Sequence, residues 1–108
     1  SGSKAMTQFR ILSETNAMVE LSGMIYRQFR LLIQAREILD EGGSSRQVEK
    51  ELRVLPFVAD KLTGQARRFS MKQLLDVLGR LLQIDEDMKS GGMPGEVAFE
   101  LLIADLTT

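Results

Sequence analysis

The sequence predicts an all-α fold, a compact bundle of five to six helices joined by short loops. Apolar residues recur at three- and four-residue spacing along nearly the whole chain, and no segment keeps the two-residue alternation of a strand. Helix start and stop signals separate these segments at short intervals. The 108 residues, 44% apolar and 27% charged, are enough for a single core.

We expect one helical domain over residues 6–108. The first five residues, Ser1-Gly2-Ser3-Lys4-Ala5, have the composition of an expression scar and are set aside from the fold prediction.

The first predicted helix is long, from Asn16 to about Glu41. A pair of glycines, Gly42 and Gly43, ends it, because a left-handed residue closes a last helical turn without a Cβ penalty. Whether a further short helix covers Met6 to Leu12 is left open. The apolar face of the long helix is formed by Met18, Leu21, Met24, Ile25, Phe29, Leu32, Ala35, Ile38 and Leu39.

Two shorter helices are expected next. Ser44 and Gln47 have the spacing of a capping box, and the helix that they begin has to stop before Pro56. Pro56 suits the first turn of the following helix, which we expect to run to about Arg68. Its inward residues are Val58, Leu62 and Ala66.

Of the predicted helices, the next one has the clearest start signal. Ser70 and Gln73 form a capping box, and Phe69 is placed to pack on Leu74 as a hydrophobic staple. This helix continues to a stop at Gly91-Gly92. A last helix is expected to begin near Pro94 and to use Val97, Ala98, Leu101, Leu102 and Leu106.

The residue types present argue against catalysis by this chain. Cysteine and histidine are both absent, which removes thiolate nucleophiles, the commonest general base and the commonest transition-metal ligands. No glycine-rich phosphate loop occurs. We therefore expect no catalytic site, no cofactor and no metal. Asp85 and Lys89, four residues apart, are expected to form a surface ion pair.

Long-range attraction to a polyanion or to a membrane is not expected either. The net charge is −1, and no apolar run approaches the length of a membrane span.

The candidate subunit interface consists of six residues. Arginine and tyrosine are favoured at interface hot spots, and such side chains cluster at two places in the chain. The alternative is that they are solvated: two would then complement a helix dipole and the others would lie beside the apolar face. The six residues are Tyr26, Arg27, Gln28, Arg30, Arg67 and Arg68.

Two alternative functions stay open, a helix-turn-helix nucleic-acid-binding domain and a generic helical protein-interaction module. The helices on either side of Arg53-Val54-Leu55 have the spacing of a helix-turn-helix, but the second begins Pro56-Phe57-Val58-Ala59, which cannot hydrogen-bond a base edge. We predict that this hairpin is a corner of the core instead.

Several segments in order resemble the C-terminal domain of the delta subunit of the bacterial DNA polymerase III clamp loader. They are Met24 to Leu32, Gly43 to Leu52, Pro56-Phe57-Val58 with Lys61-Leu62, Gln65-Ala66-Arg67 with Phe69-Ser70, Asp85 with Met88-Lys89-Ser90-Gly91, and Ala98 to Leu102. Upstream of Met24 the likeness is loose, and the family's domain usually begins further upstream.

This resemblance implies a subunit-assembly domain, called a collar, that is a fragment of a longer protein. Such domains pack into a ring of loader subunits, while clamp opening and ATP use belong to other domains of the loader. The implied partners are the other clamp loader subunits, with the sliding clamp and DNA reached only through the parent protein or complex. It also implies a bacterial cytoplasmic protein of the DNA polymerase III holoenzyme, with no catalytic site here. Missing helices upstream would favour self-association of the fragment.

Overall fold

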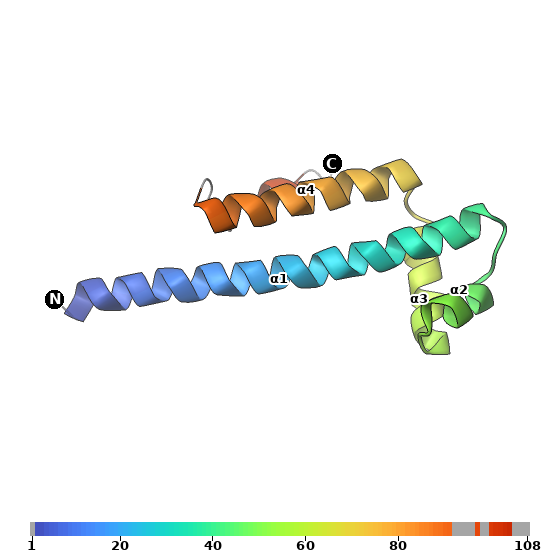
Figure 1. Ribbon diagram of the computed structural model, residues 1–108, viewed down its shortest axis with the longest axis horizontal. Coiled ribbons are helices and arrows are strands. Elements are labelled where there is room, and N and C mark those ends of the chain that lie inside the picture. Colours follow the sequence, from blue (N-terminus) through green and yellow to red (C-terminus); the bar gives the residue numbers. More distant parts are fainter. Residues whose placement is uncertain (1, 92–96, 98–99, 105–108) are drawn as a thin grey trace. The chain divides into compact units, whose positions relative to one another are not determined.

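A computed structural model of the chain describes residues 2–91, 97 and 100–104. Within these residues the regular structure is helical: α1 (Gly2–Asp40), α2 (Ser45–Leu52), α3 (Pro56–Ala66) and α4 (Met71–Ser90) (Figure 1). Residues 97 and 100–104 are helical as well, and no described residue lies in a strand. The predicted fold class, an all-α bundle with short loops, is confirmed.

The chain divides into two units, each described by itself. One unit consists of Ser1–Ile25 with Arg80–Thr108, and the other of Tyr26–Gly79. The second unit, called the central unit below, contains α2, α3 and the adjoining parts of α1 and α4. All six residues of the candidate interface belong to the central unit.

The first helix is longer than predicted, since α1 begins at Gly2 instead of Asn16 and absorbs the segment from Met6 to Leu12. No proline occurs before Pro56, so nothing in this segment removes a helical hydrogen bond. At the start of α1 the Thr7 Oγ1 hydroxyl donates a hydrogen bond to the Ser3 carbonyl oxygen at 2.9 Å. Four of the residues set aside as a scar, Gly2 to Ala5, thus lie in the helix, and their origin stays a prediction.

The end of α1 has the predicted glycine stop. Gly42 is left-handed, with φ of 88°. Its N–H donates to the Leu39 carbonyl at 3.0 Å, and the Gly43 N–H donates to the Ile38 carbonyl at 2.8 Å. These two bonds form a Schellman motif, which satisfies carbonyls that the helix leaves without partners.

The start of α2 differs from the prediction. Ser44 is the N-cap residue but makes no side-chain capping bond. The Gln47 amide instead donates to Glu51 Oε1 at 3.4 Å, and the neighbouring Ser45 hydroxyl donates to Asp60 Oδ1 on α3. The predicted capping box is therefore right in its position but its bonds do not form, and the Gln47 side chain bonds to Glu51 instead.

Pro56 is the first residue of α3, as predicted. The helix ends at Ala66, two residues before the predicted end, because its last turn tightens. The Arg68 and Phe69 N–H groups donate to carbonyls three residues back, at 3.1 Å and 3.2 Å, which is 3₁₀ geometry.

The capping box before α4 is confirmed. The Ser70 N–H donates to Gln73 Oε1 at 2.8 Å, and the Gln73 N–H donates to Ser70 Oγ at 3.1 Å. Phe69 packs against the cluster that contains buried Leu74, as the staple requires. At the other end of α4, Gly91 has φ of 75°, in agreement with the predicted stop.

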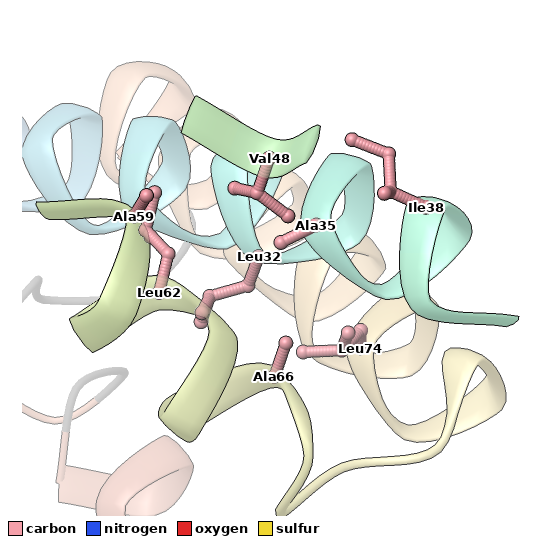
Figure 2. Packing of buried hydrophobic residues seen from close by; sticks show 8 residues of the cluster. All are labelled: Leu32, Ala35, Ile38, Val48, Ala59, Leu62, Ala66 and Leu74. Carbon is pink, nitrogen blue, oxygen red and sulfur yellow. The ribbon is translucent and has the colours of Figure 1, made fainter. Parts of the chain in front are cut away.

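One hydrophobic cluster holds the central unit together (Figure 2). Figure 2 shows Val48 of α2 beside Ala35 of α1, and Ala66 of α3 facing Leu74 of α4. Phe29 and Phe69 add an edge-to-face ring contact at 6.0 Å between centroids. The buried members of the cluster are Leu32, Ala35, Ile38, Val48, Ala59, Leu62, Ala66 and Leu74.

The other unit buries a separate set of side chains, namely Ser22, Leu81, Ile84, Met88 and Leu102. Asp85 and Lys89 form the predicted ion pair at 2.9 Å. Leu21 and Met24 are exposed, so these two members of the predicted apolar face of the long helix are not part of the core. Of the last predicted helix, Leu102 is buried and Leu101 exposed, while Pro94, Ala98 and Leu106 lie outside the described residues.

Candidate subunit interface

Four candidate residues lie on consecutive turns of α1 within the central unit. Tyr26 is half-buried, whereas Arg27, Gln28 and Arg30 are exposed. The Arg30 guanidinium carbon lies 5.9 Å from the centroid of the Tyr26 ring. This cation–π contact leaves Arg30 at the surface, where it is held beside an aromatic ring and stays accessible.

Gln28 connects α1 to α3. Its Nε2 donates a hydrogen bond to Gln65 Oε1 at 3.1 Å, across 37 positions of sequence. Gln65 was not among the residues predicted for the site, because nothing local relates it to Gln28. The bond holds the surface of α1 that carries Arg27 next to α3.

Arg67 and Arg68 are both exposed just beyond the end of α3, where cations complement the helix dipole. The structure does not bond them to the α1 residues. A different arginine, Arg36, links the two helices: its Nη1 donates to the carbonyl oxygens of Ala66 at 3.2 Å and Phe69 at 3.5 Å.

Arg36 was missed in the sequence, although a signal for it exists. Its Nε and Nη2 donate to Asp40 Oδ1 at 2.8 Å and 2.6 Å. An Arg–Asp pair four residues apart on one helix is recognisable from spacing. What spacing cannot reveal is that the same guanidinium also satisfies carbonyls at the end of α3.

A groove of about 470 Å³ lies between α1 and α3; we call it the α1/α3 groove. Its apolar floor includes buried Leu62 and half-buried Leu31 and Val58. Phe57 is 69% exposed, so the prediction that this hairpin is a corner of the core is wrong for that residue. The groove is lined by Gln28 and Leu31 from α1, and by Phe57, Val58, Lys61, Leu62 and Gln65 from α3.

The sequence signal for the groove is the position of Phe57. It directly follows the proline that begins α3, one residue before the inward-facing Val58. On a helix, neighbouring positions point about 100° apart, so an inward Val58 and Ala59 leave Phe57 near the surface.

Nothing in the described residues is arranged for metal chemistry, since they contain no group of three or more His, Cys, Asp or Glu side chains that could hold a metal ion. None of the described helices is long and apolar enough to cross a membrane. The feature of the central unit that could have a function is a helical surface with an exposed aromatic side chain, an apolar groove and several exposed cations. Residues of these types are common where a protein contacts another macromolecule.

The fold and this surface define an all-helical domain with a candidate protein-contact surface. Residues 2–106 match the family described as the C-terminal domain of the DNA polymerase III delta subunit. The chain belongs to that family, which confirms the resemblance found in the sequence.

A sequence match and a structural match, both to Bacillus subtilis, agree with this assignment. The DNA polymerase III subunit delta of strain 168 is 28% identical over 98 residues, which is 91% of this chain and 28% of the relative. The solved structure of the B. subtilis DNA clamp loader delta protein (YqeN) superposes with a TM-score of 0.76 at 26% identity, over 97% of this chain and 31% of that one. The chain therefore spans less than a third of the length of these relatives.

Proposed function

We propose that this domain is a collar, the subunit-assembly domain of a clamp loader delta subunit. In this role it holds the delta subunit among the other loader subunits and so supports the loading of the sliding clamp onto DNA. The work of nucleotide use and clamp opening would fall to other parts of the loader. The protein would then act in the bacterial cytoplasm, as part of the DNA polymerase III holoenzyme.

The observation that carries this proposal is the family membership of nearly the whole chain. The surface of the central unit supports it, because exposed Arg27, Arg30 and Phe57 are residue types that interfaces prefer. The ring contact between Arg30 and Tyr26 also supports it, since a side chain already held in place loses less entropy on binding.

Sedimentation velocity tests the proposal directly. The chain is measured alone, and then mixed with the full-length ATPase and delta-prime subunits of the same bacterium's loader. We expect a faster-sedimenting mixed species. Independent sedimentation of every component would contradict the assembly function, and the same chain would then be titrated with duplex DNA across a range of salt concentrations.

A further inference from the structure

The α1/α3 groove combines an apolar floor with an exposed aromatic rim. Leu62 is 2% exposed and closes the floor, while Phe57 on the same helix is 69% exposed. A phenylalanine exposed to that extent leaves a large apolar surface in water, which burial against a partner would remove. Aromatic side chains beside a pocket are the usual anchors of an interface.

The charge on the lining of the groove is positive. Lys61 is the single charged side chain among the residues that line it, and it is exposed. Arg27 lies one turn before Leu31 on α1, and Arg68 lies three residues after Gln65, so both are close in sequence to residues that line the groove.

The charged side chains of the two helical segments on either side of the groove also give a positive net charge. Residues 26–35 and 56–68 contain five basic side chains and one carboxylate, a local charge of +4 in a chain whose net charge is −1. The carboxylate, Asp60, accepts a hydrogen bond from the Ser45 hydroxyl. A partner segment that complements this surface therefore carries acidic side chains.

The form of the partner follows from the groove. Two packed helices with an apolar floor match the apolar stripe of a third helix, the helix-in-groove mode of recognition. Nucleic acid fits less well, because its phosphates need cations along the contact, and most of the groove lining is apolar or amide.

We propose that the α1/α3 groove receives an amphipathic helix of a neighbouring loader subunit, with its apolar stripe against Phe57 and its acidic side chains toward Lys61 and Arg27. This inference rests on the proposed assembly function and names the surface and the chemistry of its partner.

The test uses two single variants in the groove, Phe57→Ala and Lys61→Glu. Both side chains are exposed, so neither change disturbs the buried cluster. Affinity for the full-length ATPase and delta-prime subunits is measured by fluorescence anisotropy. We expect each variant to weaken the complex by about tenfold or more, with an unchanged thermal unfolding curve.

Matched controls come from the same chain. Phe9 is also 69% exposed but belongs to the other unit, so Phe9→Ala removes an equally exposed ring that is not part of the unit containing the groove. Lys72→Glu makes the same charge reversal at an exposed position of α4. Both controls should bind as the unsubstituted chain does.

A second probe tests the partner's chemistry. Two synthetic helical peptides of about 15 residues share a leucine stripe, flanked in one by glutamates and in the other by lysines. The acidic peptide should bind, should lose affinity with Lys61→Glu, and should bind less tightly as salt rises.

The outcomes separate the two proposals. If the unsubstituted chain joins neither subunit, the assembly function is wrong. If it joins them and both groove variants join equally well, the groove inference is wrong and the assembly function stands. Equal binding of the two peptides, or binding of duplex DNA that Lys61→Glu abolishes, would overturn the acidic helix as the occupant.

Discussion

The guanidinium group of Arg36 donates hydrogen bonds to three different residues. It pairs with Asp40 one turn along α1, and it donates to the Ala66 carbonyl at the end of α3 and, at longer range, to the Phe69 carbonyl in the connection between α3 and α4. Its side chain is 20% exposed and that of Asp40 is 48% exposed. The partly shielded bonds to α3 should therefore matter more than the exposed ion pair.

We expect Arg36→Met to lower the free energy of unfolding by about 1–3 kcal/mol, since bonds from a charged donor are lost while the methionine keeps much of the packing. Asp40→Asn should change it by less than about 1 kcal/mol, because it removes only the ion pair. Urea unfolding followed by circular dichroism measures both. Equal losses would mean that the bonds to α3 contribute nothing.

Thr63 is a buried polar residue of a different kind. It is 2% exposed, and its Oγ1 has no hydrogen-bond partner within the part of the chain that the structure describes. A buried hydroxyl without a partner loses its bonds to water and gains nothing in return.

Thr63→Val should consequently raise the free energy of unfolding by about 1 kcal/mol, because valine has nearly the same shape without the hydroxyl. The midpoint of urea unfolding should rise with no change in slope. Thr7→Val serves as the contrast, since that exposed hydroxyl donates to the Ser3 carbonyl, and this change should not stabilise the chain. A loss of stability in Thr63→Val would show that the hydroxyl is satisfied.

At the scale of the element, α1 and α2 end in the same backbone conformation with different residues. Gly42 is left-handed after α1, and Arg53, with φ of 53° and ψ of 46°, is left-handed after α2. Both ends carry the long-range capping bond: Gly43 N–H to the Ile38 carbonyl, and Val54 N–H to the Glu49 carbonyl at 3.3 Å. Only glycine adopts this conformation without a Cβ penalty.

Arg53→Gly is therefore expected to stabilise the chain by about 0.5–1 kcal/mol, the left-handed penalty less the extra entropy of glycine in the unfolded state. Gly42→Ala should act in the opposite direction by about 1 kcal/mol. A Cβ at Gly42 would meet nothing within 4 Å, so any loss there is conformational rather than steric. Thermal unfolding of both variants measures the direction of each change in stability. A destabilised Arg53→Gly variant would contradict the predicted cost of the left-handed conformation.

The two serine N-caps offer a second comparison between elements. Ser70 forms both bonds of its capping box, while Ser44 makes no side-chain bond to its helix. We expect Ser70→Ala to cost about 1 kcal/mol and Ser44→Ala about half of that or less. Urea titrations of the two variants side by side measure the difference, and equal costs would mean that the box at α4 contributes no stability.

At the scale of the whole molecule, the candidate interface predicts an effect on assembly without an effect on folding. Arg27→Glu with Arg30→Glu reverses two exposed charges on α1. The lost contact with Tyr26 is worth only about 0.5–1 kcal/mol at an exposed site, so the chain should still fold. The mixed complex with the other loader subunits should weaken, as measured by sedimentation velocity.

Arg46→Glu is the control for this double variant, since it reverses an exposed charge on α2 and should leave assembly unchanged. Assembly that is indifferent to the change at Arg27 and Arg30 would remove both from the interface. The groove proposal would then depend on the results for Phe57→Ala and Lys61→Glu alone.

The sequence by itself determined the helical class, most of the helix ends and the family. The stops at Gly42 and Gly91, the start at Pro56 and the box of Ser70 with Gln73 were all predictable, because each depends on residues that are neighbours in sequence. The ordered motifs identified the family for the same reason, since order and spacing are properties of the chain.

Only the tertiary structure decided which apolar residues stay exposed and which distant side chains meet. Leu21 and Met24 belong to the apolar pattern of the long helix yet remain exposed, because burial depends on whether another helix covers that position. The bond between Gln28 and Gln65 and the contact of Ser45 with Asp60 join residues far apart in sequence, and no local spacing specifies them. The candidate site is of this kind: its residue types could be chosen from the sequence, but the groove between them exists only once α1 and α3 have packed.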